Sequence, residues 1–434
     1  MKRIAKIIRP IAADSVIMYG EHHINLRNYK KMKPKSPKKS RDRNPIVPLI
    51  LIAAVAAAAL GFFLFAFCRS TEKASTKSAK KTDPVAAQVQ RMSTEEKVGQ
   101  LFIVTPDQLT GTTAVTAGDT TRDRVKQYQP GGLIYFDDNL KNPTQTQKLL
   151  ADTKQIYQDL GLPAPFLAVD EEGGEVARVA GNAAFGVQNV GDMRDIGRTG
   201  NPAKASAVGT TIGTYLSGLG FNLDFAPDAD VLTNPANKIV ARRSFGSDAE
   251  LVTQMSAAEA RALSACGVIP CLKHFPGHGA TAGDTHAGAA STSKTLDQLM
   301  QAELVPFNNV NSYAPMIMAG HIAAPRVTGD ETPACLSKKM VTGVLRNKLH
   351  YKGVVITDSL QMGAVTQTTD SGQAAVAALE AGCDLLLMPK DFPAARSAVL
   401  TAVQNGTISE KRLNASVTRI LKCKAKLNKT AKLK

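Results

Sequence analysis

Short apolar runs recur along the chain, and longer segments with helical spacing separate them. Each run is too short for a helix and is rich in β-branched or bulky apolar residues, as strands buried on both faces of a parallel sheet require. The runs occupy residues 100–105, 131–136, 165–170, 222–227, 268–275, 315–321, 353–358 and 383–389.

The segments between the runs repeat apolar residues three and four positions apart, which predicts amphipathic helices. Eight strands that alternate with helices predict an α/β fold, a single (β/α)8 TIM-type barrel. A doubly wound open sheet is the alternative, although no GxGxxG or Walker-type loop follows any run. The clearest helical segments are Thr144–Leu160, Pro202–Leu219, Asp248–Ala265 and Leu296–Val310.

A longer apolar run, residues 46–68, contains 23 residues and no charge. At 1.5 Å per residue such a run can cross a hydrocarbon core of roughly 30 Å, so it predicts a transmembrane helix before the barrel. The Lys/Arg cluster that precedes it predicts a cytoplasmic N-terminus and an extracytoplasmic catalytic domain, a single-pass protein of the cell membrane. A cleaved signal peptide, and hence a secreted protein, is the alternative.

The net charge of +16 is unevenly distributed. Lys and Arg concentrate at the two ends of the chain, whereas the body between them is mildly acidic. No basic stripe with interleaved aromatic residues is present, so we expect no nucleic-acid partner. The predicted division is a basic cytoplasmic arm (1–45), the transmembrane helix (46–68), a polar stalk (69–82), the catalytic barrel (83–422) and a basic tail (423–434).

Polar residues follow several of the apolar runs, where a barrel places its chemistry. Asp358 is the clearest candidate, because VVIT delivers one carboxylate to the predicted barrel mouth. Such a carboxylate can act as a nucleophile toward an anomeric carbon, although it could also cap the next helix. Asp284 and His286 offer a proton donor, since the carboxylate can orient the imidazole and stabilise its charged form. Taken alone, this Asp-X-His pattern could equally be a loop hydrogen bond.

The other candidates are donors and acceptors suited to a polar ligand. Lys273 and His274 suit sugar hydroxyls, and Arg178 and Arg243 suit hydroxyls or a carboxylate, although each arginine could equally form a salt bridge at the barrel rim. The histidine spacings fit no common zinc motif, and the six cysteines contain no CxxC pair. We therefore expect no metal and no other cofactor.

Four stretches, in order, resemble the catalytic barrel of glycoside hydrolase family 3, in its bacterial β-N-acetylhexosaminidase branch, over residues 84–422. They are VDEEGGEVAR, ARRSFGSDAELV, CLKHFPGHGATAGDTH and VVITDSLQMGAV. The resemblance implies that Asp358 is the nucleophile and that Asp284 and His286 form the acid/base dyad. It further implies that Asp170, Arg243, Lys273 and His274 contact the substrate, and that His278 shapes the loop.

The function expected from this resemblance is a retaining exo-β-N-acetylglucosaminidase that removes terminal β-linked GlcNAc from peptidoglycan fragments or related glycans. A phosphorylase or a β-glucosidase-like hydrolase of the same family is the alternative among enzymes, and a wall-glycan-binding protein is the alternative without catalysis. The expected partners are a GlcNAc-containing glycan or muropeptide and the membrane, and we expect a monomer.

Overall fold

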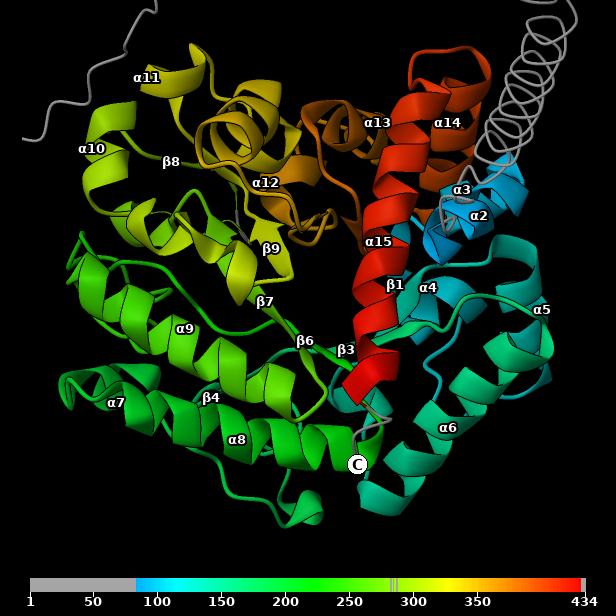
Figure 1. The fold of residues 1–434 in the computed structure, drawn as a ribbon, viewed down its shortest axis with the longest axis horizontal. Helices are drawn as coiled ribbons and strands as arrows, with labels where there is room; N and C mark the ends of the chain where they lie inside the picture. Colours follow the sequence, from blue (N-terminus) through cyan, green and yellow to red (C-terminus); the bar gives the residue numbers. More distant parts are fainter. Residues whose placement is uncertain (1–82, 282, 284, 286–287, 431–434) are drawn as a thin grey trace, which may run out of the picture. The chain divides into compact units, whose positions relative to one another are not determined.

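The computed structural model describes residues 83–281, 283, 285 and 288–430. Eight parallel strands form the central sheet, in the order β11-β9-β7-β6-β3-β2-β1-β12 (Figure 1). Each lies within one of the eight apolar runs. Their bounds are β1 Phe102–Val104, β2 Gly132–Ile134, β3 Phe166–Val169, β6 Leu223–Asp224, β7 Ile269–Phe275, β9 Met316–Ala319, β11 Val354–Thr357 and β12 Leu386–Leu387.

The two edges of this sheet meet. Ile356 of β11 forms a parallel bridge with Leu385, next to β12. The Thr357 N–H donates to the Leu385 carbonyl at 3.0 Å, and the Leu385 N–H donates to the Val355 carbonyl at 3.1 Å. The strands therefore form a nearly closed parallel barrel, which confirms the predicted TIM-like α/β fold rather than an open sheet.

Helices surround the barrel (Figure 1). α8 shows how local signals set their ends: the Asn201 side chain accepts the Ala203 N–H before the first turn, and Gly220 ends the helix at φ 107°. The helices are α2 Pro84–Arg91, α3 Thr94–Gly99, α4 Pro106–Thr110, α5 Asp119–Tyr128, α6 Pro143–Asp159, α7 Met193–Arg198, α8 Pro202–Leu219, α9 Ala249–Ala265, α10 Leu296–Gln301, α11 Pro325–Thr328, the π-helical segment Lys339–Lys348, α12 Gly363–Thr366, α13 Ser371–Ala381, α14 Phe392–Gln404 and α15 Glu410–Thr430.

Two elements differ from the predicted bounds. The helix expected over Leu296–Val310 ends at Gln301, because Pro306 lacks an N–H and its ring would clash with the carbonyl four residues before it. At the other end of the chain, α15 continues past residue 422. Cys423 and Lys424 are 4% and 6% exposed, so this part of the predicted basic tail packs on the barrel.

The predicted membrane location is not supported. Among the described residues, no helix combines the length and the apolar character needed to cross a bilayer. This finding contradicts the predicted single-pass location in the cell membrane. Residues 1–82, which include the predicted arm, transmembrane helix and stalk, lie outside the described part of the chain.

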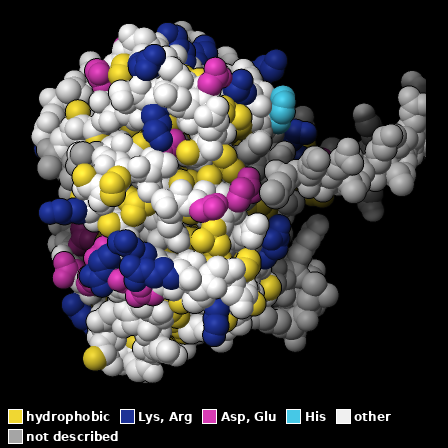
Figure 2. Space-filling view, turned by 90° about the vertical axis from the view of Figure 1, so that its left-hand side faces the viewer, with side chains coloured by type: hydrophobic (Ala, Val, Ile, Leu, Met, Phe, Trp, Pro, Cys, Tyr) yellow, Lys and Arg dark blue, Asp and Glu magenta, His cyan; other side chains and the backbone are white. Residues whose placement is uncertain are grey.

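The surface of the described body carries charges of both signs. On the face drawn in Figure 2, Lys and Arg side chains alternate with Asp, Glu and apolar side chains.

Candidate active site

A cavity of ≈ 260 Å³ opens at the carboxyl ends of the barrel strands, where TIM barrels place their active sites. Six of the eight predicted site residues line it, although they come from strands and loops distributed over the chain. They are Asp170, Arg178, Arg243, Lys273, His274 and Asp358.

Asp284 and His286, the remaining two predicted residues, lie outside the described residues. Thr285, between them in the sequence, is 2% exposed. Its carbonyl accepts a hydrogen bond of 3.2 Å from the Ala364 N–H at the start of α12. The proposed acid/base role of the dyad therefore stays a prediction.

Asp358 directly follows β11 and is held by its own backbone. Its N–H donates to the Ala319 carbonyl of β9 at 2.8 Å, and its Oδ1 accepts the Ser359 N–H at 2.7 Å. Burial favours the protonated acid, but the charges of His321, His274 and Lys273 and the Ser359 N–H outweigh that effect and lower the pKa of Asp358. The carboxylate is thus ionised at neutral pH, as a nucleophile requires.

Lys273 lies on β7 and bridges two carboxylates of the loop after β3. Its Nζ donates to Asp170 Oδ1 at 2.9 Å and lies 2.6 Å from Glu172 Oε1. Although burial disfavours the ammonium, these two carboxylates raise the pKa of Lys273 above its ordinary value. Lys273 is therefore a fixed positive charge that is 3% exposed and faces the cavity.

Arg243 also binds Glu172. Its Nε and Nη2 each donate to a different oxygen of Glu172 at 2.8 Å, a bidentate pair. Burial would raise the pKa of Glu172, but Arg243 and Lys273 hold it well below its usual range. Glu172 thus acts as a buried anion that fixes the two cations at the cavity wall.

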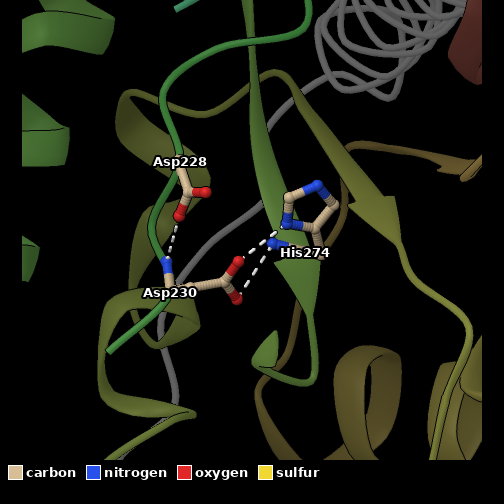
Figure 3. Close-up of side chains that lie close together, drawn as sticks. All are labelled: Asp228, Asp230 and His274. Carbon is tan, nitrogen blue, oxygen red and sulfur yellow. Dashed lines mark hydrogen bonds and ion pairs between the residues drawn. The ribbon is translucent and has the colours of Figure 1, made fainter. Parts of the chain in front are cut away.

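His274 is oriented from behind by Asp230 (Figure 3). Its Nδ1 lies 2.7 Å from Asp230 Oδ2, and the other carboxylate oxygen accepts the backbone N–H groups of His274 at 3.3 Å and His278 at 2.6 Å. Burial opposes the charged imidazole, yet the Asp230 carboxylate raises the pKa of His274. We assign the Nδ1 proton to this hydrogen bond, which leaves Nε2 for Arg243 Nη2, 3.4 Å away.

Asp228, Asp230 and His274 also have the composition of a metal site, with one ligand atom from each lying within 4.8 Å of the others (Figure 3). Three hydrogen bonds occupy the Asp230 oxygens, and the Arg243 guanidinium lies 3.6 Å from Asp228 Oδ2. Burial and the Asp230 charge raise the pKa of Asp228 to about 8, which favours a protonated carboxyl. These features fit a proton-sharing group better than a cation site.

Among the described residues, two polar atoms of the cavity lining have no hydrogen-bond partner: Arg178 Nε and Ser359 Oγ. The Arg178 guanidinium lies over the Phe136 ring at 5.6 Å and pairs only loosely with Asp137, at 3.8 Å. Because buried polar groups are normally satisfied, both atoms are placed to bind a polar ligand.

Sequence reasoning did not select Glu172 or Asp230 as site residues. Two glutamates follow Asp170, and only the second points to the mouth, whereas Glu171 accepts the Tyr215 hydroxyl at 2.8 Å and backbone N–H groups behind it. The two-residue alternation of an extended chain could have made this distinction, because it places Asp170 and Glu172 on one side. Asp230 follows the apolar run 222–227, but its role depends on its contact with His274 of β7, which the sequence alone does not show.

The comparisons with known proteins identify the family of the chain. A sequence profile described as "Glycosyl hydrolase family 3 N terminal domain" matches residues 93–423. The chain therefore belongs to glycosyl hydrolase family 3, as the four stretches predicted.

Beta-hexosaminidase A of Pseudoalteromonas piscicida is 33% identical over 70% of this chain and 54% of its own length. Beta-hexosaminidase LpqI of Mycobacterium tuberculosis is 33% identical over 81% of this chain and 90% of its own length. A solved β-N-acetylglucosaminidase of the family from Paenibacillus sp. superimposes with a TM-score of 0.73 at 35% identity, over 78% of this chain and 63% of the other. These names agree with the predicted glycoside hydrolase class and do not favour its alternatives, although the chain spans little more than half the Pseudoalteromonas protein.

Proposed function

We propose that the chain is a retaining exo-β-N-acetylhexosaminidase that releases terminal β-linked GlcNAc from peptidoglycan fragments or related glycans. The observation that carries this proposal is the ionised Asp358 carboxylate in a cavity whose other walls present Lys273, Arg243, His274 and Asp170. An anionic nucleophile beside a fixed set of hydroxyl-binding groups is what a glycosidase requires.

The reaction takes two steps. Asp358 forms a bond to the anomeric carbon while the glycosidic bond breaks, and the departing oxygen takes a proton from His286, supported by Asp284. His286 then removes a proton from water, which attacks the same carbon and releases Asp358. Each step inverts the anomeric centre, so the product keeps the β configuration.

The substrate-binding role is assigned to residues that can form further hydrogen bonds. Lys273 has three N–H bonds and two carboxylate partners, so one bond is free for a hydroxyl. Arg178 Nε and Ser359 Oγ have no hydrogen-bond partner in the part of the chain that the structure describes. The ≈ 260 Å³ cavity is smaller than the roughly 300–1,000 Å³ typical of pockets for drug-sized ligands, which favours one sugar unit and an exo mode of action.

The test uses the full chain and 4-nitrophenyl β-GlcNAc. Asp358→Ala should lower kcat by about 10³-fold or more, because it removes the carboxylate proposed to form the covalent bond. Proton NMR of early product from the unaltered chain should show the β anomer. Turnover by Asp358→Ala at the unaltered rate, or early formation of the α anomer, would contradict the mechanism.

A further inference from the structure

His321, two residues after β9, is a titratable side chain that the proposed mechanism does not use. It is 1% exposed and lies outside the set of residues that line the active-site cavity. It nevertheless lies close to the nucleophile. Burial raises the pKa of Asp358, and the largest effect that opposes burial is the charge of His321. His321 therefore acts on Asp358 from outside the cavity.

Ser359 connects the two side chains. Its N–H donates to Asp358 Oδ1 at 2.7 Å, so it helps to set the direction of the carboxylate. Its carbonyl accepts the Met362 N–H at 3.1 Å and lies 2.9 Å from His321 Nε2. Ser359 is thus held through both its N–H and its carbonyl, and a shift of its backbone would turn the Asp358 carboxylate.

These contacts determine where the imidazole of His321 carries a proton. A carbonyl oxygen can only accept a hydrogen bond, so His321 Nε2 must be the donor to Ser359. The other ring nitrogen, Nδ1, lies 3.2 Å from Cys335 Sγ. A neutral ring accepts the Cys335 S–H there, and a charged ring donates its Nδ1 proton to the sulfur. Nε2 keeps its proton in both forms, as the hydrogen bond to Ser359 requires.

Cys335 is itself held beside the ring. Its side chain is fully buried, and burial raises the pKa of its thiol well above the ordinary value, so the sulfur keeps its proton. Its N–H donates to the Gly320 carbonyl at 3.0 Å, and its own carbonyl accepts the Cys383 S–H at 3.3 Å. These bonds fix the backbone of Cys335 and so keep the sulfur next to His321 Nδ1.

We infer that His321 is a positioning residue for the nucleophile: its Nε2–H holds Ser359, and the Cys335 thiol at Nδ1 keeps that proton on Nε2. This inference rests on the proposed function, because it gives His321 a role in directing the Asp358 carboxylate at the anomeric carbon. The role needs no contact between His321 and the sugar.

The first experiment compares three full-length chains on 4-nitrophenyl β-GlcNAc. His321→Leu removes both ring nitrogens and should lower kcat about 30-fold to 100-fold, because misplacing a reacting group by about 1 Å can cost about 10²-fold. KM should change less than about 3-fold, since the groups that bind the sugar stay in place. His321→Gln places an amide N–H close to the position of Nε2 and should recover kcat to within about 5-fold of the unaltered chain.

The second experiment observes the ring proton directly. Nitrogen NMR of the full chain with labelled histidine distinguishes a protonated ring nitrogen from one with a lone pair, and comparison with His321→Gln identifies the signals of His321. We expect a protonated Nε2 in the unaltered chain.

Substitutions of the cysteine test the contact at Nδ1. Cys335→Ala should lower kcat about 3-fold to 10-fold, the effect of one net hydrogen bond, whereas Cys335→Ser keeps a donor for Nδ1 and should lose less. Cys423→Ala is the matched control, because Cys423 is a buried cysteine of α15 outside the active-site cavity. It should leave kcat unchanged.

The outcomes separate the positioning role from the proposed function. An unaltered chain that cannot cleave 4-nitrophenyl β-GlcNAc would contradict the proposed function itself. In an active chain, an unprotonated His321 Nε2, or a folded His321→Leu chain with the same kcat as His321→Gln, would contradict the positioning role alone. The ring measurement keeps the test decisive if His321→Leu does not fold.

Discussion

The two ends of the barrel both bury a carboxylate among cations, but they use it differently. At the mouth, Glu172 is shared by Lys273 and Arg243. At the base, Asp384 accepts hydrogen bonds from Arg346 at 2.6 Å and from Arg419 at 2.7 and 2.9 Å.

The two ends differ in how many polar atoms lack a hydrogen-bond partner among the described residues. Both Asp384 oxygens are filled by protein donors, including the Ser416 hydroxyl at 2.6 Å and the Val355 N–H at 3.1 Å. At the mouth, Asp228 Oδ2, Arg178 Nε and Ser359 Oγ have no hydrogen-bond partner among the described residues. A closed charge cluster fixes the packing of α15 on the barrel, whereas an open one keeps donors and acceptors ready for a ligand.

The largest expected effect is a loss of stability, and it comes from a substitution of Asp384 at the lower end of the barrel. Asp384→Asn should lower the free energy of unfolding by about 3–5 kcal/mol, because it leaves buried guanidinium groups without their anion. Denaturant unfolding followed by circular dichroism measures this loss. Activity per folded molecule should stay within about 2-fold, and a comparable loss of activity in the folded fraction would remove the distinction between the two ends.

At the mouth, Lys273→Met should lower kcat/KM for 4-nitrophenyl β-GlcNAc by about 10²-fold, since a charged hydrogen bond to the substrate is lost. The acid limb of the pH profile should also move to higher pH. Burial already favours the protonated Asp358, and the Lys273 charge is one of those that lower its pKa, so its removal raises that pKa. An unmoved acid limb would show that Lys273 does not act on Asp358.

Asp230→Asn should have a smaller effect, a loss of about 10-fold in kcat/KM, because Asp230 only positions His274. The amide can still accept the His278 N–H but removes the charge that raises the pKa of His274. Titration of the His274 ring by NMR should therefore show a lower pKa in the variant. An unchanged His274 pKa would mean that Asp230 has a purely structural role.

Lys424 at the base gives an effect on stability that depends on pH. Burial lowers its pKa to about 7, although its Nζ donates to Gln100 at 2.9 Å. The unfolded chain therefore binds this proton more tightly, so stability should rise with pH between about 7 and 10. Lys424→Met should flatten that rise by up to about 1.4 kcal/mol per pH unit, measured by unfolding at pH 7 and pH 9.5. A variant with the slope of the unaltered chain would contradict a neutral buried Lys424.

The sequence predicted all eight barrel strands, because strands buried in a parallel barrel are short apolar runs. It also predicted six residues that line the cavity, because the carboxyl ends of parallel strands lie at the same end of the barrel. It did not decide between Glu171 and Glu172, although the two-residue alternation distinguishes them, and it did not identify the role of Asp230, which depends on a contact with His274 of another strand. The end of α10 was missed although Pro306 marks it. The predicted membrane location was wrong. It rested on the apolar run 46–68, whereas no helix among the described residues is long and apolar enough to cross a bilayer.

The central claim, that Asp358 bonds to the sugar, is tested most directly by trapping that bond. A fluorinated β-GlcNAc analogue with a good leaving group should form the glycosyl-enzyme faster than water breaks it. Peptide mass spectrometry should then place one sugar on Asp358 in the unaltered chain and none on this peptide in Asp358→Ala. A trapped sugar on another residue, or release of the analogue with no adduct at any time, would contradict the account.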